Sequence, residues 1–163
     1  MSSAADRGGS EGLLIGLGHA ERQDDGVGPF VARELQRRGF PAVVHSGDGT
    51  ALLDLWDGQP VCVVVDAMAA PGAEPGALRV FTDFEDPGFQ RAGFVHSTHR
   101  LGLPEAVALG RTLGRLPGRL VVVGIAGRAF GFGPDLSPAV AAAAEHLVAR
   151  LADRGFSFDL EAL

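Results

Sequence analysis

The sequence predicts an α/β protein, a three-layer α/β/α sandwich built around a mostly parallel, twisted sheet of about five strands. Short apolar runs of strand length alternate along the chain with segments whose apolar residues recur at helical spacing. Several of the apolar runs are uninterrupted, which is typical of parallel strands that are covered on both faces. The 163 residues of the chain also correspond to one domain of about 150 residues.

The strands are predicted from the apolar runs. Residues 61–66, with the sequence Val-Cys-Val-Val-Val-Asp, form the clearest strand, which is apolar on both faces until its terminal aspartate. Residues 77–81 form a shorter strand in which polar and apolar side chains alternate. The predicted strands are residues 13–18, 42–44, 61–66, 77–81 and 120–125.

The first helix is predicted to follow the first strand after a polar stretch. Apolar side chains recur at helical spacing from Val27 to Leu35. Asp24 or Asp25 is expected to cap the start of this helix, and Gly39 suits its end.

Three more helices are predicted further along the chain. Thr50 is expected to cap a short helix, whereas Ser137 and Pro138 open the last helix as N-cap and first helical residue. Residues 83–98 and 126–136 are expected to be irregular, the second segment being rich in glycine. These further helices cover residues 50–56, 103–113 and 138 to about 153.

Composition excludes several classes of protein. Fourteen basic against 20 acidic residues give a net charge of −6, which argues against nucleic acid as a partner. No apolar run reaches the ~18 residues of a membrane span and no signal peptide is recognisable, so a cytoplasmic protein without membrane contact is expected. The single cysteine, Cys62, excludes an intramolecular disulfide and a zinc site built on cysteines. Residues 1–11 are predicted to be a disordered tail and residues 12–163 a single domain.

Polar residues lie at the carboxyl ends of the predicted strands, where open α/β sheets bind ligands. Asp24 and Asp25 follow the first strand, Asp66 ends the third, and His99 lies in a loop that enters a helix. Two carboxylates and an imidazole suit a borderline divalent metal. Each residue also has an ordinary structural explanation, as a helix cap, a strand-end hydrogen bonder or a structural histidine. The spacing alone therefore leaves both a metal site and purely structural roles open.

Other chemistries have weaker support in the sequence. The Gly-Leu-Gly after the first strand begins like a dinucleotide-binding loop, but Glu21 stands where the third glycine belongs. A nucleotide-binding oxidoreductase is therefore disfavoured, and the absence of lysine excludes a Walker loop. Ser97 lacks the Gly-x-Ser-x-Gly context of a hydrolase nucleophile, and Cys62 lies in mid-strand.

Several short motifs follow one another between residues 13 and 150. They are Gly16-Leu17-Gly18-His19, Asp24-Asp25-Gly26-Val27-Gly28, Gly47-Asp48-Gly49-Thr50, Val65-Asp66-Ala67, Ser97-Thr98-His99-Arg100-Leu101-Gly102, Val123-Gly124-Ile125 and Leu136-Ser137-Pro138-Ala139-Val140. In type, order and spacing they resemble the hydrogenase maturation endopeptidases, which trim the large-subunit precursor of nickel–iron hydrogenases.

This resemblance implies a site and a reaction. An acidic residue after the first strand, an aspartate ending a later strand and a histidine before a helix converge on a divalent metal in that family. In this chain they correspond to Asp25, Asp66 and His99, the implied catalytic and metal-binding residues. The implied metal is nickel supplied by the substrate, with another divalent metal as the alternative. The implied partner is the precursor of a nickel–iron hydrogenase large subunit, from which a monomeric enzyme removes a C-terminal peptide.

Two versions of the mechanism remain open at this stage. A bound metal can polarise the scissile carbonyl and lower the pKa of a water molecule. Alternatively, the ligands only grip the nickel of the substrate, and the carboxylate of Asp24 or Asp48 acts as general base.

The chain also departs from the pattern of the family. His19 stands where many relatives have asparagine, either as an extra ligand or as a loop hydrogen bonder, and Ala126-Gly127 stand where relatives have glutamate and proline. His96 is treated as secondary to His99, and His45 and His146 as structural or solvated. These departures leave a second function open, a nickel-dependent chaperone that docks the precursor without cutting it.

Overall fold

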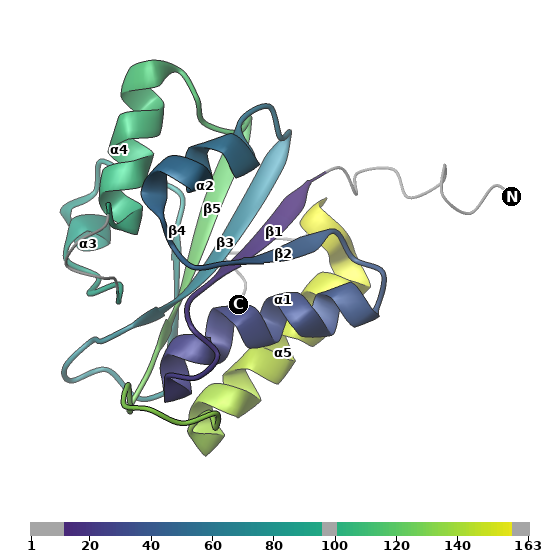
Figure 1. Cartoon of the computed structure of the whole chain (residues 1–163), viewed down its shortest axis with the longest axis vertical. Coiled ribbons are helices and arrows are strands. Elements are labelled where there is room, and N and C mark those ends of the chain that lie inside the picture. The colour runs from purple at the N-terminus through teal and green to yellow at the C-terminus, as the bar shows by residue number, and fades with distance from the viewer. Residues whose placement is uncertain (1–11, 96–100, 158–163) are drawn as a thin grey trace, which may run out of the picture.

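The computed structural model describes residues 12–95 and 101–157, which form a five-stranded sheet between two layers of helices (Figure 1). The strand order is β2-β1-β3-β5-β4, and β4 alone runs antiparallel to its neighbour. The predicted α/β/α sandwich with a mostly parallel sheet is thereby confirmed. The strands are β1 (Leu13–Leu17), β2 (Ala42–His45), β3 (Val61–Met68), β4 (Leu78–Phe81) and β5 (Arg119–Ala126).

Helices cover both faces of this sheet. Helices α1 (Val27–Arg37) and α5 (Pro138–Arg154) lie side by side on one face (Figure 1). The other face is covered by α2 (Gly49–Trp56), α3 (Pro87–Gln90) and α4 (Leu103–Leu113). Two 3-10 helices complete the described elements, η1 (Gln23–Gly26) before α1 and η2 (Gly155–Ser157) after α5. None of the helices in the described part of the chain is long and apolar enough to cross a membrane.

The core consists of two apolar layers that the central strands separate. In β3, Val63 and Val65 pack in the layer beneath α1 and α5, whereas Cys62 and Val64 pack in the layer beneath α2 and α4. This alternation follows from the two-residue period of a strand, and it explains why residues 61–65 are apolar without interruption. Each fully buried aliphatic side chain contributes about 1.5–3 kcal/mol to the free energy of folding.

Two glycines, Gly16 and Gly28, allow the start of α1 to pack directly against β1. A Cβ atom at Gly16 would overlap the carbonyl oxygen of Gly28, and one at Gly28 would overlap the carbonyl oxygen of Leu17. Neither position therefore accepts a side chain without movement of the backbone. This close approach fixes η1, and with it Asp25, against the carboxyl ends of β1 and β3.

Several local predictions are corrected by the structure. Neither Asp24 nor Asp25 caps α1, whose N-cap is Gly26 without any side-chain hydrogen bond. The cap of α2 is Asp48 rather than Thr50, since the Asp48 carboxylate accepts from the Thr50 amide at 3.2 Å. The strand predicted to end at Asp66 continues through two more residues, and residues predicted to be irregular include the short helix α3.

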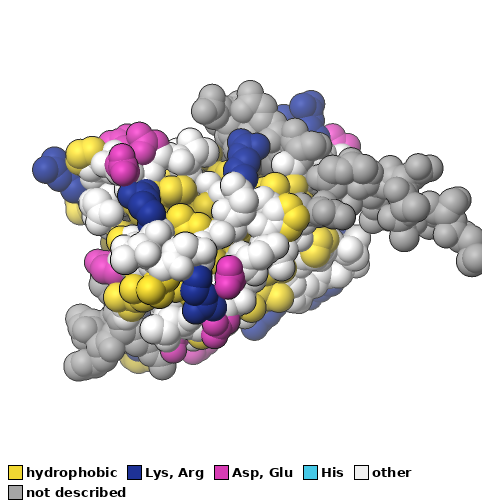
Figure 2. All heavy atoms as spheres, turned by 90° about the horizontal axis from the view of Figure 1, so that it is seen from above, with side chains coloured by type: hydrophobic (Ala, Val, Ile, Leu, Met, Phe, Trp, Pro, Cys, Tyr) yellow, Lys and Arg dark blue, Asp and Glu magenta, His cyan; other side chains and the backbone are white. Residues whose placement is uncertain are grey.

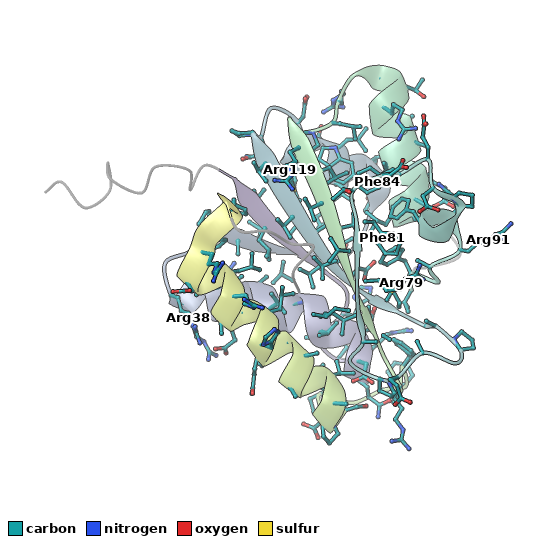
Figure 3. The ribbon with its side chains drawn as sticks, turned by 180° about the vertical axis from the view of Figure 1, so that it is seen from behind. Arg38, Arg79, Phe81, Phe84, Arg91 and Arg119 are labelled. Atoms are coloured by element: carbon teal, nitrogen blue, oxygen red, sulfur yellow. The ribbon has the colours of Figure 1, made fainter. Side chains whose placement is uncertain are left out.

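The antiparallel strand β4 forms one edge of the sheet. The last residue of β4, Phe81, packs edge-on against Phe89, with ring centroids 5.4 Å apart, and Phe84 also contacts Phe89. The guanidinium carbon of Arg79 lies 5.1 Å from the centroid of the Phe81 ring. Figure 3 shows Arg79, Phe81 and Phe84 along this edge. A charged side chain on an edge strand discourages pairing with another chain.

Candidate functional site

Two buried carboxylates lie at the carboxyl ends of the central strands. Asp25 lies in η1, directly after the connection from β1, and Asp66 lies near the end of β3. Each of them is 3% exposed. Strand β2, which follows β1 in the chain, pairs with one edge of β1, and β3 pairs with the other edge. The two carboxylates therefore lie at a topological switch point of the sheet. Open α/β sheets bind their ligands at such points.

Asp25 is oriented by the loop that precedes it. Its Oδ2 atom accepts a hydrogen bond from the backbone amide of His19 at 2.9 Å. Gly18 has a φ of +134°, and a Cβ there would overlap the carbonyl oxygen of Asp25, so the turn depends on glycine. Burial raises the pKa of Asp25 above its usual value, although the hydrogen bond from His19 and the charge of Arg22 oppose that shift.

Asp66 is the more deeply perturbed of the two carboxylates. Its Oδ1 atom accepts from the amide of Ala67 at 2.9 Å. Burial, and then the negative charge of Asp25, raise the pKa of Asp66 well above its usual range. Each of the two buried carboxylates accepts one hydrogen bond from the described residues, and the charge of one raises the pKa of the other, which favours either a shared proton or a cation between them. The pair can therefore supply two carboxylate ligands to a divalent cation.

Asp24, the direct neighbour of Asp25, lies in a very different environment. Its carboxylate accepts four hydrogen bonds, from the backbone amides of Arg128, Ala129 and Ser137 and from the Ser137 hydroxyl, at 2.7–2.9 Å. Burial alone would raise the pKa of Asp24, but these donors lower it below its usual value. A carboxylate whose lone pairs are occupied in this way is a poor general base. Asp24 therefore holds the loop between β5 and α5 in place, and these bonds disfavour it as the general base.

The remaining groups considered from the sequence differ in their accessibility. Asp48 is half-buried and accepts from the amide and hydroxyl of Thr50 as the cap of α2, so its role as a base stays a prediction. Burial raises the pKa of the Cys62 thiol to about 12, which makes this cysteine unreactive. Nδ1 of the His19 ring lies 3.9 Å from Oε1 of Glu21, and the backbone amide of His19 donates to Asp25.

His99, the third predicted ligand, lies outside the described residues, as does His96. Among the residues that are described, no cluster of three or more potential ligands is found, so the structure brings together Asp25 and Asp66 alone. The side chain of Asp66 belongs to the face of β3 that carries Cys62, Val64 and Met68, the face covered by α4. His99 precedes the first residue of α4 by four positions in the sequence. The three-ligand set remains a prediction.

The contacts of Asp24 could not be predicted from the sequence. The residues that bind its carboxylate follow it by 104 to 113 positions, and no local motif links the two segments. Ser137 is the N-cap residue of α5 and Pro138 its first helical residue, as predicted, but the Ser137 hydroxyl donates to Asp24 and makes no cap hydrogen bond. A serine placed before proline signals a helix start in either case, so the pattern did not distinguish the two uses of the hydroxyl.

Comparison with known proteins gives one consistent result. The family model described as hydrogenase maturation protease matches residues 30–154. The Hydrogenase 2 maturation protease of Escherichia coli K12 is 24% identical over 152 residues, which are 88% of this chain and 92% of that protein.

Solved structures share the fold at similar identity. The NiFe hydrogenase maturation protease HybD from Thermococcus kodakarensis superposes with a TM-score of 0.69 at 23% identity, covering 88% of this chain and 97% of that one. The hydrogenase maturating endopeptidase HybD from E. coli gives 0.68 at 24% identity, with 89% and 94% covered. Because the family model covers most of the sequence, we conclude that this chain is a protease of the hydrogenase maturation protease family.

Proposed function

We propose that the protein is an endopeptidase that recognises nickel in the precursor of a nickel–iron hydrogenase large subunit and removes the C-terminal peptide of that precursor. The observation that carries this proposal is the buried pair of Asp25 and Asp66 at the switch point of the sheet. Membership of the family supports the class of substrate. His99 is proposed as the third ligand on the strength of the resemblance described above.

Two carboxylates together with the proposed imidazole of His99 favour a metal of borderline hardness. Carboxylate oxygens together with one imidazole suit first-row divalent ions, and three protein ligands leave positions open for groups of the substrate. A cation between Asp25 and Asp66 offsets their mutual repulsion and restores both to the charged form. Nickel that arrives within the substrate therefore stabilises the docked state, whereas a precursor without nickel leaves the repulsion in place.

Each described residue has a defined part in this scheme. Asp25 and Asp66 bind the metal, and the amides of His19 and Ala67 hold the two carboxylates in position. When bound, the metal would polarise a nearby carbonyl group and lower the pKa of a water molecule. Cleavage then depends on metal loading of the precursor, so the reaction acts as a checkpoint of assembly.

The experiment is to incubate a nickel-loaded precursor with the enzyme and to follow release of the C-terminal peptide by mass spectrometry. We expect the wild type to release one peptide, and Asp66→Asn, Asp25→Asn and His99→Ala to release none. Asp153→Asn and His146→Ala, at exposed positions on α5, are the matched controls and should cleave normally.

The outcomes separate the alternatives. Equal cleavage of nickel-free precursor would contradict nickel recognition, and normal cleavage by both Asp66→Asn and His99→Ala would contradict the assigned site. A wild type that binds the precursor without releasing a peptide would favour the chaperone function.

A further inference from the structure

The segment between β5 and α5, residues 127–136, is held tightly against the residues that precede α1. The amide of Gln23 donates to the carbonyl of Gly133 at 2.8 Å, and the amide of Gly133 donates to the carbonyl of Glu21 at 2.8 Å. The Gln23 side chain accepts from the amide of Gly131 at 2.9 Å. Together with the four bonds to Asp24, these contacts fix the loop in one conformation. In Figure 1 this loop and the start of α1 lie together at the lower end of the sheet.

This fixed loop presents one large apolar side chain to solvent. Phe132 is 83% exposed, whereas every other phenylalanine of the described residues is at least partly buried. The guanidinium carbon of Arg22 lies 5.1 Å from the centroid of the Phe132 ring. Packing within the molecule does not explain Phe132, because its ring contributes almost nothing to the core. Aromatic residues and arginine are the types enriched at the centres of protein interfaces.

Phe132 lies in a loop that contacts η1, the element that carries Asp25. Arg22 forms a parallel β-bridge with Gly133, the residue next to Phe132, and Arg22 is three positions before Asp25. A protein that contacts the Phe132 ring therefore meets the same end of the sheet at which Asp25 and Asp66 lie. The loop is ordered without a partner, so little conformational entropy is lost when a partner binds.

We propose that Phe132, with Arg22 against its ring, is the anchor through which the protease docks the folded body of its substrate protein. The expected counterpart is an apolar pocket on that protein, with a carboxylate at its rim that pairs with the guanidinium of Arg22. The inference rests on the proposed function, because the occupant is the precursor that the enzyme cleaves. It adds a docking contact outside the metal ligands, which makes selection of the partner independent of nickel recognition.

The test compares steady-state cleavage of full-length, nickel-loaded precursor by the wild type, Phe132→Ala and Leu113→Ala. Leu113 is the matched control, since it is a large apolar residue, 55% exposed, at the opposite end of the sheet. Figure 2 shows that opposite end, where charged and apolar side chains are interspersed. We expect Phe132→Ala to raise KM by about 10- to 100-fold with kcat unchanged, and Leu113→Ala to change neither. Phe132→Trp should retain KM within about threefold, because it keeps an aromatic anchor.

Arg22 provides a second, electrostatic readout. The Kd of the wild type for the precursor should weaken as sodium chloride is raised, and Arg22→Ala should reduce that salt dependence. Thermal unfolding of Phe132→Ala should match the wild type, because the ring is exposed.

Four outcomes distinguish this inference from the proposed function. Cleavage by the wild type together with an unchanged KM in Phe132→Ala would overturn the docking role and leave the proposed function intact. A loss of kcat at unchanged KM would also overturn it. A wild-type protease that is dimeric in isolation, together with a monomeric Phe132→Ala variant, would show that a second copy of the chain contacts the Phe132 ring, which would overturn the docking role. No cleavage by the wild type would refute the proposed function, and direct binding of the precursor to both proteins would still test the anchor.

Discussion

Two carboxylates that are adjacent in the sequence, Asp24 and Asp25, lie in opposite electrostatic environments. Asp24 accepts four hydrogen bonds at the base of the β5–α5 loop, and these lower its pKa. Asp25 accepts one from the residues that the structure describes and faces a second buried carboxylate, Asp66. The described residues thus donate four hydrogen bonds to the charge of Asp24 but only one each to Asp25 and Asp66.

The difference separates structural from functional use of the same side chain. The hydrogen-bond donors to Asp24 come from the protein itself, so this carboxylate stabilises the fold and its oxygens are already occupied. Asp25 and Asp66 each accept one hydrogen bond from the described residues, so their charges are less well compensated and a cation between them would offset their repulsion. Isosteric replacement of aspartate by asparagine should therefore have opposite consequences at the two places.

The largest expected effect is on processing of the precursor. Asp66→Asn should lower kcat/KM by on the order of 10³-fold or more, because a neutral amide is a weak metal ligand and several kcal/mol of metal stabilisation are lost. The measurement is the rate of peptide release under single-turnover conditions, with Asp153→Asn as the control. A loss of less than tenfold would show that the carboxylate pair is not the metal site.

The next effect is on stability, at Asp24. Asp24→Asn should lower the free energy of unfolding by about 3 kcal/mol, because the amide group of asparagine points a donor at amides that need an acceptor. Urea denaturation at pH 7 measures this change. Asp135→Asn, at an exposed position in the same loop, is the control and should stay within about 0.5 kcal/mol of the wild type. An unchanged midpoint for Asp24→Asn would mean that the four hydrogen bonds contribute no net stability.

The same substitution at Asp66 should act in the other direction. Asp66→Asn is expected to raise the free energy of unfolding at pH 7 by about 1–2 kcal/mol, because it removes a buried carboxyl group that must either hold a charge or take up a proton at this pH. A pKa that is raised in the folded state means that the folded protein binds more protons than the unfolded chain between 3.8 and the raised value. The contribution of Asp66 to stability therefore increases as pH falls through this window, and the advantage of Asp66→Asn should shrink.

Asp24 should give the reverse pH dependence. Its pKa is lowered in the folded state, so its stabilising contribution is complete above the unfolded value of 3.8 and disappears as pH falls below it. Denaturation of the wild type and the two variants between pH 7 and pH 3 measures both trends. An Asp66→Asn advantage that does not change with pH would contradict the assigned environment of Asp66.

The sequence predicted one side of this comparison and not the other. The strand pattern and the resemblance together singled out Asp25 and Asp66, because carboxyl ends of parallel strands meet at one edge of the sheet, and the structure buries both residues there. The exact partners of Asp24 depend on how a glycine-rich loop more than 100 residues away folds back, and periodicity carries no information on that. The capping predictions for Asp24 and Asp25 failed for the same reason, and Ser137, although it is the predicted N-cap of α5, uses its hydroxyl in a tertiary hydrogen bond instead of a local one.

The smallest expected effect isolates one bond of the Asp24 network. Ser137→Ala removes the hydroxyl that donates to Oδ2 of Asp24 at 2.7 Å but keeps the Ser137 amide that donates to Oδ1. We expect a loss of about 1 kcal/mol in the free energy of unfolding, because two backbone amides still serve Oδ2. If the network acts as a unit, Ser137→Ala combined with Asp24→Asn should cost less than the sum of the two changes, by about 0.5–1 kcal/mol. Strict additivity in this double-mutant cycle would show that Ser137 stabilises the start of α5 independently of Asp24, and the loop would then be anchored by its backbone amides alone.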